Sequence, residues 1–400
     1  MKIKQIPDDF HVDEISNIVP TDGPFALYRL TKSGWTTSDA LSVIRRAWHV
    51  SPVRVSFGGL KDRHARTTQH VTIDRGPRRD FSQRDIALAY LGQTPEAFTS
   101  RDITANWFQI AIRDVTQDEL DIASGALDEV RRDGLANYFD DQRFGSVEGA
   151  DEFMARRLVL GDWEGALKLA LTGDYEYDRA AQRREKAILA RHWGDWSQCL
   201  RKLPRCDSRR IVGYLAAQRS DFRGAIGGIP SELSSLYLSA FQSHLWNRML
   251  ARWLERRLPP GQRVLVPLKL AEAPMPHGIP ADLRENLARW VLPLPSARLH
   301  YDAVIEQAPT DWPSVVRAVM ADEGIELEQM KLKGLRRPFF ARGERAVHCQ
   351  PANLSADAMP DERHHQRFKL VLRFDLPRGS YGTLVVKRVT QSRPATGDAF

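Results

Sequence analysis

The sequence has little cysteine, and its few cysteines suit neither a disulfide framework nor a zinc site. Three occur in 400 residues: Cys199, Cys206 and Cys349. An odd count in a chain of this length argues against a set of structural disulfides. No C-x-x-C pair is present, so the usual spacing of zinc-binding cysteines is missing as well. We therefore expect free thiols in a reducing compartment, which favours a cytoplasmic protein.

Long apolar runs and common cofactor motifs are also missing. No stretch of about 18 consecutive apolar residues occurs, so we expect no membrane-spanning helix. The opening MKIKQIPDDF has basic residues without an apolar segment behind them, unlike a secretory signal. The chain lacks G-x-G-x-x-G, a Walker A loop, H-E-x-x-H and G-x-S-x-G. These absences argue against dinucleotide redox chemistry, nucleotide hydrolysis, zinc hydrolysis and esterase chemistry, so an enzyme of this sequence would work with side chains alone.

The composition is that of a globular protein with an excess of positive charge. Hydrophobic residues make up 42% of the chain and charged residues 27%, which excludes a disordered or fibrous protein. At ~100–200 residues per domain, the length predicts two domains, or one large domain with an insertion. Lys and Arg number 58 against 51 Asp and Glu, and the resulting net charge of +7 suggests a polyanionic partner.

The positive charge is concentrated in one stretch in the middle of the chain. Residues 178–223 contain 12 Lys and Arg and 5 Asp and Glu, so this stretch alone accounts for the net charge of +7. A solvated helical face would explain such a charge run without any partner. If the partner is a polyanion, a segment that contacts its phosphates is the better hypothesis.

Hydrophobic periodicity predicts two α+β ends around a mostly helical middle. Near the N-terminus we expect helices at 37–48 and from the capping box Thr116–Glu119 to Gly134, with strands at 25–32, 53–57, 71–73 and 107–112. From about 150 to 335 the pattern is mostly helical, with its best helix at 232–258 and a proline-rich, irregular stretch at 267–295. Strands joined by a turn are expected at 368–374 and 384–389. This order predicts a middle domain inserted into an α+β core.

The most distinctive segment is FGGLKDRHARTTQ, residues 57–69. Its two glycines follow a predicted strand and would let the backbone turn sharply and approach a neighbouring strand. Asp62 stands between Lys61 and Arg63, whose charges would lower the pKa of its carboxyl group. An ionised carboxylate on such a loop is a candidate nucleophile or base. A surface turn with a weak ion pair explains the same residues, and charged loop residues are more often of that kind.

Three further segments stand out. NYFDDQRFG at 137–145 mixes aromatic rings with amide and guanidinium groups, which suits a nucleobase, although a turn with buried aromatics would explain it too. LYLSAFQSHLWN at 236–247 predicts a buried helix in which His244 is structural. DLPRGSYGTLVV at 375–386 is predicted to be a strand-turn-strand scaffold.

Taken together, these segments resemble the TruD family of pseudouridine synthases. The family's loop motif G-x-K-D-[RK]-x-A-x-T-x-Q is matched at 59–69. Its N-Y-F-G-x-Q-R-F-G motif is matched at 137–145, with Asp140 in place of a glycine. The pattern K-x-x-P-[ED]-D-F-x-V-x-E is matched from Lys4 to Glu14, and L-P-x-G-S-[FY]-A-T at 376–383, with Gly382 in place of alanine. The resemblance runs in family order from residue 4 to about residue 390.

The resemblance implies a fold and an activity. It implies an α+β protein whose catalytic core, with a mixed or antiparallel sheet, comprises residues 1–160 and 340–400, around a mostly helical inserted domain at 161–339. The implied activity is that of a tRNA pseudouridine synthase, an isomerase that flips a uridine, typically at position 13 in the D-arm, and converts it to pseudouridine. We expect no cofactor and no metal, structured RNA as partner, no membrane, a monomer without an obligate protein partner, and a cytoplasmic location.

The resemblance also assigns roles to individual residues. Asp62 becomes the essential aspartate, which would attack C1′ or abstract a proton from C2′ and stabilise positive charge on the sugar. Lys4 would lie near Asp62 and keep it ionised. Phe139 would stack on the extruded base and Asn137 would help to bind it, so that Phe139→Ala should lower the rate with little effect on the fold.

Substrate contacts are expected from Lys61 and Arg63 as well. Asp140 departs from the family pattern: its charge would repel RNA phosphate or point to solvent, and aspartate would tolerate a positive φ if the position requires one.

Two other protein classes share part of this pattern. A non-catalytic tRNA-binding protein or chaperone that keeps the fold would have the same basic charge and aromatic residues but would not need Asp62. A base methyltransferase would need a glycine-rich cofactor loop, which the sequence lacks.

Overall fold

The fold is taken from a computed structural model of the chain. It describes residues 1–400 apart from 148–152, 176–177, 300–307, 333, 336–338 and 396–400. The chain forms two compact units, one of Met1–Leu135 with Cys349–Thr390 and one of Ala136–His348 with Gln391–Phe400. These unit boundaries differ from the domain boundaries at 160 and 340 inferred from the sequence, which stay a prediction.

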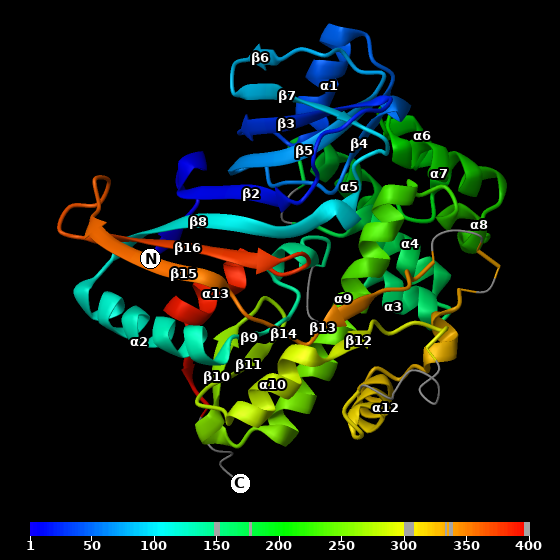
Figure 1. The fold of residues 1–400 in the computed structure, drawn as a ribbon. Coiled ribbons are helices and arrows are strands. Elements are labelled where there is room, and N and C mark those ends of the chain that lie inside the picture. The colour runs from blue at the N-terminus through cyan, green and yellow to red at the C-terminus, as the bar shows by residue number, and fades with distance from the viewer. Residues whose placement is uncertain (148–152, 176–177, 300–307, 333, 336–338, 396–400) are drawn as a thin grey trace. The chain divides into compact units, whose positions relative to one another are not determined.

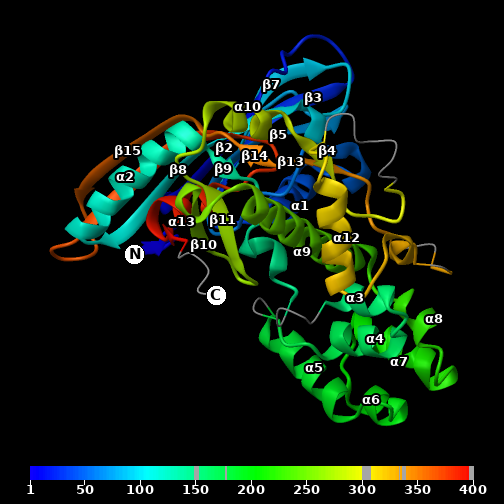
Figure 2. The ribbon, with the colours of Figure 1, turned by 90° about the horizontal axis from the view of Figure 1, so that it is seen from below.

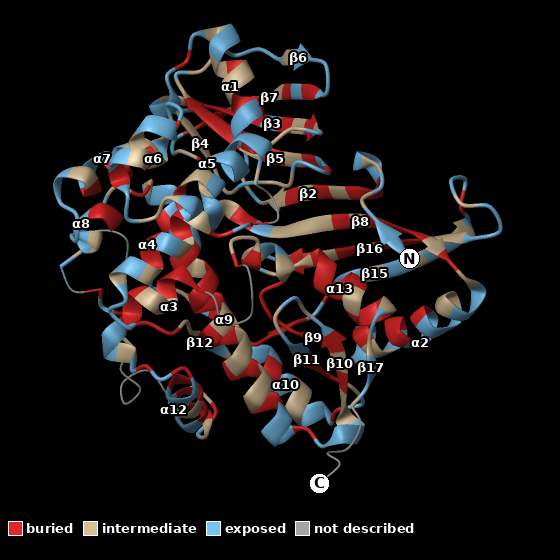
Figure 3. Cartoon of the chain, turned by 180° about the vertical axis from the view of Figure 1, so that it is seen from behind, coloured by how far each residue is buried: buried red, intermediate tan, exposed pale blue. Residues whose placement is uncertain are grey.

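One mixed, ten-stranded sheet forms the framework of the first unit (Figure 1). Its strands follow the order β15-β16-β8-β2-β5-β3-β7-β6, with β1 paired to β8 and β4 to β5. The pair β2 and β5 is parallel, and the other pairs are antiparallel. The strands are β1 (Lys2–Ile3), β2 (Phe10–Ser16), β3 (Phe25–Ser33), β4 (Val55–Phe57), β5 (Arg66–Asp74), β6 (Phe81–Gln83), β7 (Ile86–Thr94), β8 (Ile103–Val115), β15 (Ala352–Pro360) and β16 (Phe368–Pro377). Buried residues run along β2, β3 and β16 (Figure 3).

Two predicted helices of this unit are confirmed, and the second has the caps that were predicted for it. Helix α1 (Thr37–Trp48) begins after Thr36, whose side chain accepts a hydrogen bond from the Asp39 amide. Helix α2 (Gln117–Asp133) begins with the capping box of Thr116 and Glu119 and ends at Gly134. The apolar side of α1 packs on β3, β5 and β7, in a core formed by Ala26, Tyr28, Leu30, Ala40, Leu41, Ile44, Val50, Val71, Ile73, Ile86 and Leu88.

The prediction of a strand at 384–389 is wrong, because this segment belongs to helix α13 (Gly382–Thr390). Both neighbours of β16 are already strands, β15 and β8, and α13 packs instead against α2. Strand alternation would expose every second residue, whereas consecutive residues are buried here: Leu384, Val385 and Val386. A Cβ atom at position 382 would lie 2.8 Å from the Phe108 ring, so Gly382 permits a close approach where the family pattern has alanine.

The second unit is mostly helical, as predicted. Its long helix α9 (Ser231–Arg257) buries Phe241, Leu245, Trp246 and Trp253, and both α3 and α12 pack against it. Helices α4 to α8 gather as a group (Figure 2), with contacts between successive members and between α4 and α8. The helices are α3 (Met154–Val159), α4 (Trp163–Thr172), α5 (Ala180–Arg191), α6 (Trp196–Lys202), α7 (Asp207–Ala217), α8 (Phe222–Ile226), α9, α10 (Ala281–Arg289) and α12 (Trp312–Asp322).

The proline-rich stretch at 267–295 is more regular than the sequence suggests. It contains the end of β10 (Arg263–Pro267), β11 (Glu272–Pro276), α10 and β12 (Val291–Pro293). Pro274 and Pro276 lie in β11, an edge strand in the order β11-β10-β17. Edge strands tolerate proline because one side of the backbone needs no partner. The other short strands are β9 (Leu135–Ala136), β13 (Glu344–Ala346), β14 (His348–Cys349) and β17 (Arg393–Pro394).

Within the described ranges, none of the helices combines the length and the apolarity that crossing a membrane requires.

Candidate active site

The loop between β4 and β5 carries Asp62. Gly58 is needed there for close packing, because a Cβ at this position would lie 2.5 Å from Ile103 Cδ1 and 3.1 Å from the Phe98 ring. Neither Gly58 nor Gly59 has a positive φ, so the sharp turn expected of them does not depend on glycine's conformational freedom. The loop instead lies close against the core cluster of Leu27, Phe98 and Ile103.

Lys4 and His64 contact the carboxylate of Asp62. Lys4 Nζ donates a hydrogen bond to Asp62 Oδ2 and forms an ion pair with it, and the amide of His64 donates to Oδ1 at 3.0 Å. Burial raises the pKa of Asp62, but the hydrogen bond and charge of Lys4, with the His64 amide, lower it below its ordinary value. The Asp62 side chain is still 27% exposed. The structure thus presents an ionised, accessible carboxylate beside a cation.

Lys4 itself has a left-handed backbone, with φ of 56°. Its ammonium group also lies 4.3 Å from the centroid of the Phe10 ring. A lysine in this conformation is strained, and such strain concentrates at functional sites.

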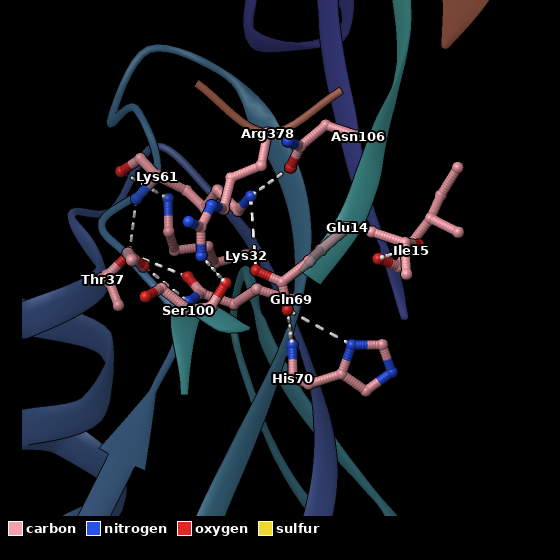
Figure 4. Close-up of polar contacts among 12 residues, drawn as sticks. Glu14, Ile15, Lys32, Thr37, Lys61, Gln69, His70, Ser100, Asn106 and Arg378 are labelled. Atoms are coloured by element: carbon pink, nitrogen blue, oxygen red, sulfur yellow. Dashed lines mark hydrogen bonds and ion pairs between the residues drawn. The ribbon is translucent and has the colours of Figure 1, made fainter. Parts of the chain in front are cut away.

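The side chains next to Asp62 in the sequence point to different surroundings. Lys61 Nζ lies 2.5 Å from Asn106 Oδ1 and 3.4 Å from Glu14 Oε2 (Figure 4). Burial lowers the pKa of Lys61, and Glu14 opposes this effect. Arg63 is exposed and has no ion-pair partner among the residues that the structure describes. The lowered pKa of Asp62 therefore comes chiefly from Lys4 and His64. The motif alone had attributed it to Lys61 and Arg63, and the family resemblance had added Lys4.

Buried polar side chains fix the backbone of this loop. Thr37, at the start of α1, accepts a hydrogen bond from the Lys61 amide at 3.0 Å and donates one to Gln69 Oε1 at 2.8 Å. Gln69 in turn donates to the Gly59 carbonyl at 3.0 Å. Figure 4 shows Thr37 beside both Lys61 and Gln69. Both side chains of this relay are buried, so β5 and the start of α1 help to fix the loop that carries Asp62.

In the second unit, Asn137 lies at the centre of a hydrogen-bonded cluster. Its Nδ2 donates to the Ala346 carbonyl at 3.0 Å, and its Oδ1 accepts from Arg345 Nη2 at 2.8 Å. Arg345 also donates to the carbonyls of Asn137 and Tyr138, both at 2.7 Å. These contacts orient the amide, and each end of it keeps capacity for one further hydrogen bond.

Phe139 follows in the same cluster and is only 4% exposed. The Arg345 guanidinium lies 3.9 Å from the ring centroid and that of Arg143 lies 5.1 Å from it. Asn247 exchanges two hydrogen bonds of 2.8 Å with the backbone of Phe139. Truncation of so buried a ring typically costs about 3–5 kcal/mol, which argues against the expectation that Phe139→Ala leaves the fold little changed; that expectation stays a prediction.

Asp140 adopts φ of −87° and is 2% exposed. It therefore neither points to solvent nor uses a left-handed conformation. The backbone conformation at this position does not require glycine, so an aspartate adopts it without strain.

The sequence did not reveal several residues that shape the two clusters. They are Glu14, Lys32, Thr37, Gln69, Asn106, Asn247 and Arg345. A sequence pattern could have identified Lys32. Alternate residues of β3 share one face, and on that face Lys32 continues a buried, otherwise apolar row of Ala26, Tyr28 and Leu30. Arg345 is 208 residues from Asn137, and no local pattern connects the two.

The comparisons with known proteins now decide the family. The profile of the family described as tRNA pseudouridine synthase D (TruD) matches residues 1–389. The chain belongs to the TruD family. "Probable tRNA pseudouridine synthase D 1" of Methanococcus maripaludis is 29% identical to this TruD chain, over 97% of this chain and 99% of the relative. "tRNA pseudouridine synthase D" of Aquifex aeolicus is 27% identical, over 97% and 98%.

A solved structure supports the same TruD fold. A crystal structure of a TruD protein from Methanosarcina mazei matches with a TM-score of 0.70 and 23% identity, covering 98% of this chain and 94% of that one. The resemblance, the α+β fold and the enzyme class expected from the sequence are confirmed. TruD enzymes isomerise uridine to pseudouridine in tRNA, and a non-catalytic RNA-binding protein is not favoured.

Proposed function

We propose that the chain isomerises a uridine in the D-arm of tRNA, at position 13, to pseudouridine, with Asp62 as the catalytic carboxylate. The observation that carries this assignment is the state of Asp62. Lys4 and the His64 amide stabilise its ionised form, and its side chain remains 27% exposed on a loop fixed by buried contacts. Perturbed carboxylates with a defined charge partner are typical of catalytic sites.

The reaction needs no co-reactant, because it only rearranges bonds within one nucleotide. The N1–C1′ bond breaks, a C5–C1′ bond forms, C5 loses its proton and N1 gains one. Asp62 would attack C1′ or remove a proton from C2′, and both steps require the ionised carboxylate. Side chains alone can supply this chemistry, so we propose that neither a metal nor a cofactor takes part.

We further propose that Asn137 and Phe139 contact the flipped base. The amide of Asn137 is already oriented by Arg345 and Ala346 and can make two further hydrogen bonds to a base edge. Phe139 would stack on the base, which offsets part of the unstacking cost of a few kcal/mol. Because the ring is 4% exposed, stacking requires a rearrangement that uncovers it when RNA binds.

Substitution of Asp62 tests the central assignment. Asp62→Asn should abolish tritium release from tRNA that carries 5-tritiated uridine, while tRNA binding in a filter assay stays within about twofold, since the amide keeps the size of the carboxyl group. Asp85→Asn is the matched control, because Asp85 is a half-exposed surface residue whose positive φ asparagine tolerates. Substantial turnover by Asp62→Asn would reject the assignment.

The basic stretch 178–223 is proposed to contact tRNA phosphates. It forms α5 to α8, and ten of its cationic side chains are exposed: 179, 183, 184, 191, 201, 202, 205, 210, 219 and 223. Only three of its acidic residues are exposed, namely Asp195, Asp207 and Asp221. The two other cations have structural contacts, because Lys186 pairs with Asp178 and Arg209 donates to the carbonyls of Leu200 and Leu203.

A neutralised variant tests this surface without disturbing the fold. Arg184 and Arg191, two turns apart on α5, and Arg205 are exposed. Their joint replacement by glutamine should weaken tRNA binding and lower the slope of log Kd against log salt by about 0.7–0.9 per lost phosphate contact. Arg84→Gln with Arg289→Gln removes two cations whose side chains are 94% and 75% exposed and serves as the control. An unchanged salt slope in the triple variant would contradict the proposal.

We propose, finally, that the protein acts as a monomer in the cytoplasm and needs no obligate protein partner. None of its three cysteines forms a disulfide, and Cys199 and Cys349 are buried, as expected in a reducing compartment. Sedimentation of the active protein at assay concentration should give the mass of one chain, and a dimer mass would contradict this.

A further inference from the structure

Lys32, near the end of β3, is a buried cation that the proposed chemistry does not yet use. Its residue is 1% exposed, and lysine is almost never buried this deeply unless it is paired. Within the described residues, Lys32 forms no ion pair. Its ammonium group instead donates to three backbone carbonyls, those of Trp35 at 2.7 Å, Asp62 at 2.8 Å and Lys61 at 3.4 Å.

The three carbonyls match the donors of an ammonium group. A protonated lysine has three N–H donors and no acceptor, so each carbonyl receives one hydrogen bond. Two of the carbonyls belong to the loop that carries Asp62, and the third precedes α1. Lys32 and Lys61 lie beside each other in Figure 4. Lys32 therefore connects the catalytic loop to the strand and to the start of the helix.

The surroundings of Lys32 make its charge sensitive to pH. Burial lowers the pKa of Lys32 to about 8, while the charge of Asp62 raises it and that of Lys61 lowers it. Its cross-strand neighbours are uncharged, Thr67 on β5 and Ile86 on β7. Two further charged groups act on these neighbours: Lys4 pairs with Asp62, and Glu14 pairs with Lys61.

We propose that Lys32 is a positioning residue, whose ammonium group fixes the backbone of residues 61–62 and so orients the carboxylate of Asp62 toward the substrate. The inference rests on the proposed role of Asp62. Loss of the ammonium proton leaves two N–H donors and one lone pair, so one of the three carbonyls loses its donor and faces a lone pair. Activity should therefore fall as the pH rises through about 8.

The first test uses the unmodified protein with tRNA transcript. Single-turnover rates of pseudouridine formation, measured from pH 6 to 9.5, should rise to a plateau and then decline with a midpoint near pH 8. The Kd for tRNA should change much less across the decline, because positioning affects the chemical step. A plateau that extends to pH 9.5 would overturn the inference.

The second test uses Lys32→Met, which keeps the length of the side chain and removes all three donors. Its single-turnover rate at pH 7 should drop by about 10–100-fold, the size of effect that a small misplacement of a catalytic group produces. Its alkaline decline near pH 8 should disappear, and its Kd for tRNA should stay near the wild-type value. Lys2→Met, at a side chain 51% exposed, should leave rate and profile unchanged. A wild-type rate, or a retained alkaline decline, in Lys32→Met would overturn the inference.

Hydrogen exchange separates a positioning role from a general structural one. In Lys32→Met, amide exchange should increase in the loop at 58–65, while α1 and the paired strands β3 and β5 keep their protection. Increased exchange throughout the sheet would show a structural role and overturn the inference. This measurement needs no activity, so it also distinguishes the two possible failures: an inactive wild type rejects the proposed function, whereas an unchanged loop in Lys32→Met rejects the role of Lys32.

Discussion

Replacing Thr37 by valine should loosen the loop that carries Asp62, and the size of the effect follows from two hydrogen bonds. The Thr37 hydroxyl accepts from the Lys61 amide at 3.0 Å and donates to Gln69 Oε1 at 2.8 Å. Thr37 and Gln69 are both 0% exposed, so water cannot take over either bond in the folded state. Valine keeps the shape of threonine, which means that the substitution removes the two bonds without creating a cavity.

The expected loss of stability is larger than the loss caused by removing an ordinary helix cap. Each partner left unsatisfied in the interior costs about 1–3 kcal/mol, so Thr37→Val should lower the free energy of unfolding by about 2–6 kcal/mol. Thr36→Val is the matched control, because the neighbouring hydroxyl only accepts from the Asp39 amide at the helix start. Loss of such a cap typically costs about 1 kcal/mol. Thr37→Ser retains the hydroxyl and should lose less than Thr37→Val.

Urea unfolding of the first unit and hydrogen exchange of the Lys61 amide measure this directly. In Thr37→Val the Lys61 amide should lose protection, and tRNA pseudouridylation should slow because Asp62 is less well placed. In Thr36→Val that amide should exchange as in the wild type. A Thr37→Val protein within about 0.5 kcal/mol of the wild type, the range of ordinary surface substitutions, would refute the reasoning.

The remaining predictions concern Lys4, Phe139 and metal ions. Lys4→Met should raise the pKa of Asp62, because burial then acts on the carboxyl group without the opposing cation. The carboxylate is then ionised only at higher pH, so the acidic side of the pH profile of kcat/KM should move to higher pH. Lys4→Arg should keep the acidic side of the profile near its wild-type position. Identical pH profiles in the wild type, Lys4→Met and Lys4→Arg would contradict the role of Lys4. Phe139→Leu fills most of the ring's volume, so it should slow single turnover with little loss of stability. Phe139→Ala should also lower the free energy of unfolding by about 3–5 kcal/mol. Unchanged single-turnover kinetics in Phe139→Leu would rule out stacking. Activity should survive prolonged treatment with EDTA, and a loss restored by a divalent cation would show that a metal takes part.

Local sequence signals predicted much of the first unit. The capping box of Thr116 and Glu119 placed the start of α2, because caps act within a few residues of the helix they begin. The segment 384–389 was predicted wrongly, since a short apolar run fits a buried strand and a buried helix equally well. Its state is decided by β16, whose two edges are already paired with β15 and β8.

The site was only partly predictable, because many of its contacts join residues that are far apart in the sequence. Asp62, Lys61 and Arg63 stand in one motif, but the cation that pairs with the carboxylate is Lys4, 58 positions away. Only the family resemblance had pointed to Lys4, and its role stays a prediction. Lys32, Thr37 and Arg345 act through contacts that link distant segments, and nothing in their immediate sequence marks those contacts. Of these three, only Lys32 had a recognisable pattern, a charged residue at an inward position of an apolar strand.

Mapping pseudouridine in a defined tRNA tests the central claim most directly. An unmodified tRNA transcript is incubated with the wild-type protein or with Asp62→Asn, and pseudouridine is located by chemical adduct formation and sequencing. We expect pseudouridine at position 13 with the wild type, and none with Asp62→Asn despite retained tRNA binding. No pseudouridine with the wild type, or equal amounts with both proteins, would contradict it.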